Sequence, residues 1–242
     1  MVAIGVFAGI SFGAYATSVT TLYDDIYADD EQGVNLPDVW VENNAGNWNS
    51  STSETLCQEI RNQWPSETLE LDHCEARLRS NGQFFSTDAD IGMIPAVWHG
   101  IDEGEVDKVW LPDHDCCSGG RMAAAADEIV IDQHAVEGLD LEIGDTVRIS
   151  AGAGYALNYT IVGIGFHSNH LYFTIGDEIL PAQAGTFVTG YMTDEGLEAL
   201  ANFSAGDSNL LLIDVEGTPD SQSPEISGLT ELIAGISDTV SE

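Results

Sequence analysis

Acidic side chains dominate this sequence: 41 Asp and Glu residues stand against 6 Lys and Arg, which gives a formal charge of -35. The acids are spread from Asp24 to Glu242 and are not gathered in one tail. Such a charge repels itself and weakens a compact fold at low salt, but at molar salt the screening length falls to about 3 Å and the repulsion fades. We therefore predict a protein of a halophile. The same charge excludes nucleic acid as a partner, because phosphate binding depends on Lys and Arg.

The first 23 residues carry no charged side chain. A membrane-spanning helix needs about 20 mainly apolar residues, and Val2–Leu22 just reaches this length. Gly5, Gly9 and Gly13 recur every four residues and would form one face suited to close helix packing. A secretory signal would need a basic leader, which is absent. We predict a transmembrane helix over residues 1–22, truncated before its basic cytoplasmic flank, with a buried soluble helix as the alternative. The acidic segment after it places the main domain outside the cell membrane.

Cysteines and glycosylation sequons suit an external, oxidising location. The four cysteines, Cys57, Cys74, Cys116 and Cys117, form an even set that allows two disulfides in any of three pairings. Because a bond between the adjacent Cys116 and Cys117 would strain the backbone, we expect each of them to reach a distant partner. Of three N-glycosylation sequons, the one at Asn49 lies in a polar loop and is the best candidate. The other two begin at Asn158 and Asn202.

Helix and strand patterns alternate at both ends of the chain, and the middle is mostly strand-like. The first part predicts strands over 38–43, 69–78 and 91–101, with a helix from Ser51 to Trp64. The middle predicts strands over 128–132, 146–150, 159–165 and 171–175, with a short helix or turn over 133–138. The last part predicts strands over 186–192 and 209–215, a helix over 194–202 capped by Thr193, and an amphipathic helix over 223–240. We expect an α+β domain of residues 23–104 and 184–242, interrupted by a small, mostly-β inserted domain over 105–183.

One stretch, together with this order of elements, resembles a known family. Its landmarks are the pair Gly120 and Arg121, a strand that ends at Asp132, a short helix, Leu141, the pair Gly144 and Asp145, the strand Thr146–Ile149, and Val162, Gly163 and Ile164. This order resembles the extracytoplasmic core domain of ABC transporter permeases of the MacB-like, FtsX-like and lipoprotein-releasing group. The resemblance also covers the N-terminal apolar segment and the strand–helix–strand pattern near the C-terminus.

The resemblance implies a porter-like α/β sandwich interrupted by a small β domain, and a mechanical role. In that family a cytoplasmic ATPase subunit drives the membrane helices, which move the external domain during export or toward an extracellular partner; we also expect a dimeric assembly. The motif itself has a structural interpretation: Gly144 and Asp145 are a turn signal, and Gly163 marks the close approach of another backbone. The alternative is a stand-alone membrane-anchored binding or adhesion protein on the same fold, and a hydrolase on this scaffold is a third possibility.

The sequence departs from that family beyond the external domain. The permeases continue into further membrane helices, but no second apolar run of about 20 residues is present here. A GxxxxGK[ST] phosphate-binding loop is absent as well, so we expect the ATPase and the remaining helices on other chains. In the family both ends of the external domain adjoin the membrane. We therefore expect Asp24–Glu31 and the end of the last helix on one side of the domain, with residues 105–183 far from the membrane.

No group of residues predicts an active site, a cofactor site or a metal site. The run 113–117 contains metal-capable side chains, but adjacent cysteines are poor zinc ligands and disulfides are the favoured interpretation. His167 and His170 lack an evident third ligand. Ser118 lies outside the G-x-S-x-G pattern of a nucleophile elbow. We expect no catalytic residue and no enzyme activity.

Overall fold

The computed structural model describes residues 35–44, 46–64, 70–87, 92–101, 106–111, 113–114, 117–152, 155–165, 184–216 and 224–240. Its elements in chain order are β1 (Val39–Glu42), α2 (Ser50–Gln63), β2 (Leu71–Phe85), β3 (Met93–Gly100), β4 (Asp113–His114), β5 (Cys117–Ser118), β6 (Glu128–Asp132), α3 (Gln133–Leu139), β7 (Thr146–Ala151), β8 (Leu157–Gly165), β9 (Val188–Met192), α4 (Asp194–Ala201), β10 (Leu210–Val215) and α5 (Pro224–Val240). This mixture of helices and strands agrees with the predicted α+β class.

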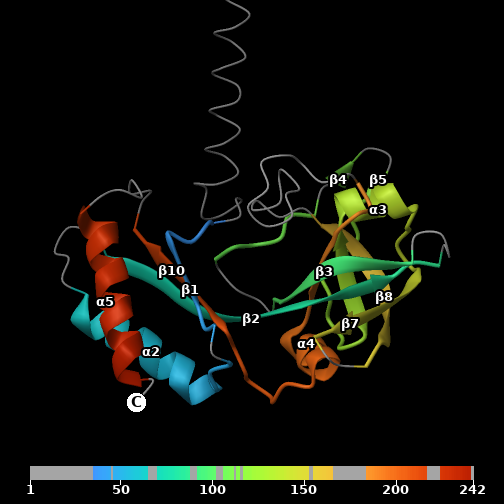
Figure 1. Ribbon diagram of the computed structural model, residues 1–242. Coiled ribbons are helices and arrows are strands. Elements are labelled where there is room, and N and C mark those ends of the chain that lie inside the picture. Colours follow the sequence, from blue (N-terminus) through green and yellow to red (C-terminus); the bar gives the residue numbers. More distant parts are fainter. Residues whose placement is uncertain are drawn as a thin grey trace, which may run out of the picture.

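One continuous sheet joins the longer strands in the order β1-β10-β2-β3-β9-β6-β8-β7. The long strand β2 pairs with β10 along its first half and with β3 along its second half, antiparallel in both cases. At the far end of the order, β7 returns to pair with β2. The strands β2, β3, β9, β6, β8 and β7 therefore close into a barrel. The strands β1, β10 and the first half of β2 remain open and carry α2 and α5 on one face (Figure 1).

The fold therefore has two lobes, the barrel and an α/β lobe made of β1, β10, the first half of β2, α2 and α5. Each lobe has its own hydrophobic core. Inside the barrel, Trp98 and Ile161 are fully buried, and burial alternates along β3 as expected for a strand with one face turned inward. In the α/β lobe, Leu56 and Ile60 of α2 pack with Leu229 of α5 over the sheet. Every residue of β10 is buried, because this strand lies between two neighbours and is covered on both faces.

Local sequence signals explain where the helices begin. The side chain of Asn49 accepts a hydrogen bond from the Thr52 backbone N–H and caps α2. Thr193 caps α4 in the same way, as its sequence predicted, by accepting from the Gly196 N–H at 3.1 Å. Asp194 and Glu195 then place negative charge at the positive end of the α4 dipole.

The two lobes do not follow the predicted division of the chain. The second half of β2, together with β3 and β9, was expected in the outer α/β domain, but these strands form the barrel with β6, β7 and β8 of the predicted insert. The reason is the pairing of β9, which lies between a parallel β3 and an antiparallel β6 and is buried throughout. The sequence also predicts that the strands over 38–43, 69–78, 186–192 and 209–215 share a sheet. They do belong to the continuous sheet, yet β2 and β3 separate β9 from β10.

Two further expectations concern the ends of the chain. Residues 1–22, the acidic segment Asp24–Glu31 and the predicted strand 171–175 lie outside the described residues. Within the part of the chain that is described, no helix has the length and apolar character needed to cross a membrane.

The entry of the described chain and the end of α5 lie at opposite ends of the β1–β10 pair. Asn35 hydrogen-bonds Asp214, beside the start of β1. Ile236, in contrast, lines a pocket with Glu42 and Trp48 at the other end of β1, and the C-terminal end lies below α5 in Figure 1. The expectation that both ends share one side of the domain therefore finds no support in the described residues.

Candidate functional site

The residues of the family-like motif come from separate stretches and meet around β8. Gly120 and Gly163 form an isolated antiparallel bridge, and the Arg121 N–H donates to the Val162 carbonyl at 3.0 Å. A Cβ on Gly163 would lie only 2.4 Å from the Arg121 carbonyl oxygen. Gly120 also has a φ of 80°. The backbones at Gly120 and Gly163 are thus in direct contact, and a side chain at either position would clash.

Arg121 also fixes the segment that leads into β6. Its Nη1 donates to Glu128 Oε2 at 2.7 Å, and its Nη2 bonds the other carboxylate oxygen. The Ala124 N–H donates to Glu128 Oε2 at 2.9 Å. These bonds, the Arg121 bond first, lower the pKa of Glu128 to about 2. The carboxylate therefore stays charged, and its bonds to Arg121 and Ala124 fix the segment before β6.

Asp132 joins three elements at the end of β6. Its Oδ1 accepts from the Ala135 N–H at 2.9 Å and caps α3, while its Oδ2 accepts from the Thr189 N–H of β9 at 2.8 Å. Only 3% of the residue is exposed. Burial raises the pKa of Asp132 to about 6, although the two backbone bonds act in the opposite direction.

Gly144 and Asp145 form the turn that brings the chain into β7. Gly144 has a φ of 100°, and its N–H donates to the Ile161 carbonyl at 2.8 Å. The Asp145 side chain accepts from the Glu142 N–H at 2.9 Å, and its carbonyl accepts from the Ile161 N–H. Gly144 and Asp145 thus hold this turn through backbone and side-chain hydrogen bonds.

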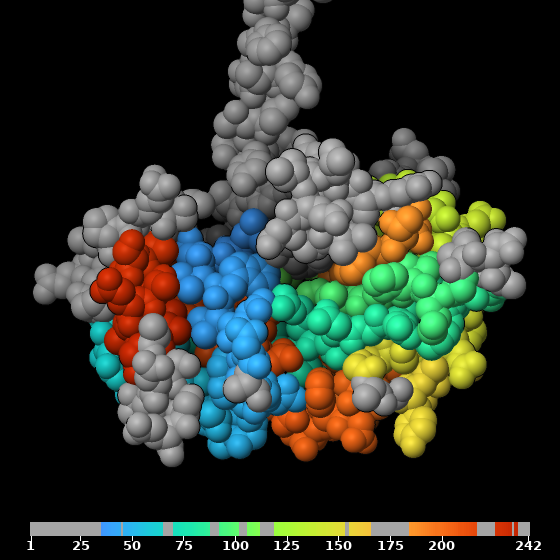
Figure 2. Space-filling model, in the orientation of Figure 1, coloured from blue at the N-terminus to red at the C-terminus, as the bar shows by residue number. Residues whose placement is uncertain are grey.

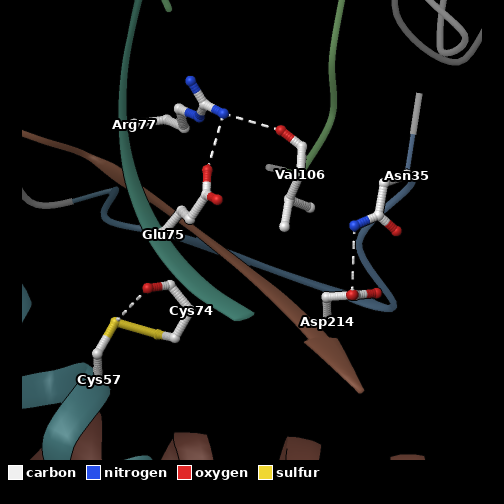
Figure 3. Close-up of polar contacts among 7 residues, drawn as sticks. All are labelled: Asn35, Cys57, Cys74, Glu75, Arg77, Val106 and Asp214. Atoms are coloured by element: carbon white, nitrogen blue, oxygen red, sulfur yellow. Dashed lines mark hydrogen bonds and ion pairs between the residues drawn. A yellow bond between two sulfur atoms is a disulfide. The ribbon is translucent and has the colours of Figure 1, made fainter. Parts of the chain in front are cut away.

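A polar junction lies on β2 where the two lobes meet (Figure 3). Arg77, which is 8% exposed, donates through Nη2 to Glu75 and to the Val106 carbonyl, both at 2.8 Å. Next to it, the Asn209 side chain accepts from the Arg79 N–H at 2.9 Å and donates to the Arg79 carbonyl at 2.8 Å. Asn209 therefore adds one pair of side-chain hydrogen bonds to β2 beyond the end of the β10 ladder. These contacts connect the pairing region of β10 to that of β3.

A pocket of about 540 Å³ opens between β1, α2 and α5. Its floor is apolar and includes Leu56, Leu211 and Ile233, all of which are almost fully buried. Its rim includes Asn43 and Asn47, whose amides can donate and accept hydrogen bonds. An apolar floor with a few polar groups at the rim is typical of a small-molecule or peptide site. Figure 2 shows α5 in red and the β1 segment in blue side by side on the surface of this lobe.

Among the described residues, three possible metal ligands converge at the other end of the β1–β10 pair. The ligand atoms of Asp72, His73 and Asp214 all lie within 4.8 Å of one another. The β10–β2 ladder has a bulge at this point, where Asp72 is the extra residue between the paired Leu71 and His73. Burial raises the pKa of Asp214 to about 6, with the charge of Asp38 adding to the rise, although Asn35 donates to it. Oxygen and imidazole ligands of this kind could hold a divalent cation.

The cysteines pair differently from the sequence expectation. Cys57 and Cys74 are joined by a disulfide that ties α2 to β2. Since the sequence holds only four cysteines, this bond leaves Cys116 and Cys117 no distant partner within the chain. Cys116 lies outside the described residues, and Cys117 belongs to the short β4–β5 pair opposite His114. The expectation that both of the adjacent cysteines reach distant cysteines of the same chain is therefore wrong.

The other sequence candidates are not brought together. His167 and His170 lie outside the described residues, and Ser118 lies in β5. Asn49 is exposed at the start of α2. The pocket and the Asp72, His73 and Asp214 cluster were both missed, because their residues are distant in the sequence or follow an ordinary strand pattern. The only sequence signal for the pocket rim was the group of asparagines at 43, 44 and 47.

No family model matches the chain, and no curated protein matches it. Two solved structures that are similar to it are extracytoplasmic domains of ABC-type transporters. The extracellular domain of the noncanonic ABC-type transporter YknZ from Gram-positive bacteria is 13% identical, with 81% of this chain and 89% of that chain covered and a TM-score of 0.43. The periplasmic region of MacB from Actinobacillus actinomycetemcomitans is 12% identical, with 81% and 82% covered and a TM-score of 0.44. Because the alignment is loose in both cases, the function must be inferred from this chain's own residues.

Proposed function

We propose that this chain is the extracytoplasmic domain of an ABC transporter permease subunit, attached to the cell membrane through residues 1–22. Its work is mechanical: motion of the membrane helices, driven by a cytoplasmic ATPase on another chain, moves the α/β lobe and through it the barrel. The barrel then meets the exported substrate or an extracellular partner. A dimeric assembly of the kind expected from the resemblance belongs to the same proposal.

The observation that carries the proposal is the assembly of the motif around β8. Gly120, Gly163 and the Gly144 turn lie in the order found in the resembling permeases, and in the fold they meet through backbone contacts that only glycine allows. A chance match of short patterns would have no reason to converge on one strand.

The shared strand β2 supports the mechanical part of the proposal. The pairing of β2 with β10 ends at Arg77 and its pairing with β3 begins at Leu78, so one continuous strand carries both ladders. The hydrogen bonds of the buried Arg77 and of Asn209 stabilise β2 where its partner changes from β10 to β3. Movement of the α/β lobe is therefore passed to the barrel as the movement of a nearly rigid body.

The test is recovery of the full-length protein from the membranes of its own cells, in molar KCl and mild detergent. We expect an ATPase subunit with a GxxxxGK[ST] loop to co-purify, and ATP hydrolysis by the complex to respond to changes in this chain. Asn209→Ala, which removes both bonds to Arg79, should uncouple hydrolysis from transport and leave the complex assembled. The matched control is Asn81→Ala, which removes the side-chain amide of an exposed asparagine of β2. Recovery of the chain without any ATPase would contradict the proposal.

A second function, a stand-alone membrane-anchored binding protein, is favoured by one observation, the pocket between β1, α2 and α5. A ligand with an apolar body and a polar end would fit its floor and its amide rim. Leu211→Trp, which fills the floor, should then abolish ligand binding by the isolated protein. Under the permease proposal the same substitution would leave the co-purification of the ATPase intact, so the two functions give different results.

A further inference from the structure

We infer that Asn49 is the N-glycosylation site of this protein and that the sequons at Asn158 and Asn202 stay unmodified. The inference rests on the proposed external location, because N-linked glycans are added on the outer side of the membrane. All three sequons have the required Asn-x-Ser/Thr pattern, and the sequence favours Asn49 only through the polar loop around it. The fold separates them.

Asn49 is exposed, and the helix cap uses the oxygen of its side-chain amide. Three hydrogen bonds converge on its Oδ1, from the Thr52 N–H at 3.0 Å, the Thr52 hydroxyl at 3.1 Å and the Ser51 hydroxyl at 2.6 Å. Because these donors all end on Oδ1, the cap of α2 does not require Nδ2. Asn49, Ser50 and Ser51 are all exposed. A transferase can therefore reach the whole tripeptide in the folded protein.

The other two sequons are tied to the barrel through their middle residues. Tyr159, which follows Asn158, is 2% exposed inside the barrel, and its hydroxyl donates to the Gly196 carbonyl at 2.7 Å. Phe203, which follows Asn202, packs against the same core. A transferase must take the whole Asn-x-Ser/Thr tripeptide into its site, and at these two places that would pull an aromatic side chain out of the core. At Asn49 the middle residue is the exposed Ser50.

The chemistry is a group transfer from a lipid-phosphate-linked glycan. The nitrogen Nδ2 of Asn49 forms a bond to C1 of the first sugar, and the bond from C1 to the phosphate oxygen of the lipid carrier breaks. The phosphate leaves with the electron pair of that bond, and Nδ2 gives up one proton. The Ser51 hydroxyl bond to Oδ1 draws density toward the oxygen, a polarisation that assists loss of this proton. The finished glycan keeps Oδ1 free to cap α2.

The experiment is site-resolved mass spectrometry of the full-length protein purified from the membranes of its own cells. We expect a peptide containing Asn49 to carry a hexose-based mass increment and the peptides containing Asn158 and Asn202 to have their unmodified masses. Ser51→Ala removes the sequon but keeps the cap, and Asn49→Asp keeps a capping oxygen but has no amide nitrogen; both should lose the increment. Ser51→Thr preserves the sequon and should retain it.

An unmodified Asn49 in the mature protein, or a glycan at Asn158 or Asn202 in its place, would overturn the inference. Protease treatment of intact cells separates this failure from failure of the proposed function. If the domain is digested from outside and Asn49 is still unmodified, the location is right and the site assignment is wrong. If the domain is not digested in intact cells, the external location is wrong, and the assignment of Asn49 as a glycosylation site is wrong as well.

Discussion

Asp132 should make the stability of this fold depend on pH, and the structure gives the direction and the size of the effect. Its carboxyl is buried at the meeting point of β6, α3 and β9, and burial raises its pKa from 3.8 to about 6. A carboxyl whose pKa is higher in the folded state than in the unfolded state favours folding while it is protonated. That contribution is complete below the unfolded pKa of 3.8 and is lost as the pH rises through about 6.

The size of the effect follows from the shift. One pKa unit corresponds to about 1.4 kcal/mol, so the rise from 3.8 to about 6 corresponds to about 3 kcal/mol in full and about 2.5 kcal/mol between about pH 4 and about pH 7.5. Asp132→Asn has the same shape but does not titrate. It also turns one acceptor into a donor that faces the Thr189 or Ala135 N–H, which should destabilise the fold by about 1–3 kcal/mol at every pH.

The assay is urea unfolding of the wild type and of Asp132→Asn in molar KCl at the two pH values. The variant should be clearly less stable than the wild type at the acidic pH, and the gap should shrink or reverse at the neutral pH, by about 2.5 kcal/mol in total. Comparison of the two proteins cancels the titration of the other acids, which is common to both. A gap between wild type and Asp132→Asn that does not change with pH would refute the reasoning.

Three further predictions concern the disulfide, the glycine contact and salt. Reduction of the Cys57–Cys74 bond, which closes a loop with a sequence separation of 17, should cost about 3 kcal/mol of unfolding free energy, measured by denaturation with and without reductant; an equal stability in both would contradict the bond. Gly163→Ala should destabilise by at least about 2 kcal/mol, since its Cβ would meet the Arg121 carbonyl, whereas Gly46→Ala, with open space around it, should change stability by less than about 1 kcal/mol. The thermal midpoint should rise steeply from low to molar KCl, and a midpoint indifferent to salt would remove the halophile interpretation.

The sequence determined the local elements because their causes are local. The strand at 128–132, the helix capped by Thr193 and the strand near 209–215 all appear close to their predicted bounds. In each case the signal lies within one turn or one alternation, such as the Thr193 side chain that bonds an N–H three residues on. The turn at Gly144 and the close approach at Gly163 were readable for the same reason: a positive φ or a missing Cβ is a property of the residue itself.

Only the tertiary structure decided which elements belong together. The composition of β9 marks it as a strand but carries no information about its partners, so β9 was assigned to the wrong lobe. The same holds for β2, whose predicted end at residue 78 falls where its partner changes from β10 to β3. The pairing of Cys57 with Cys74, the pocket between α2 and α5, and the access that separates Asn49 from the other sequons depend likewise on contacts between distant residues. Burial is encoded residue by residue, whereas the choice of partner is settled by the free energy of the whole packed arrangement.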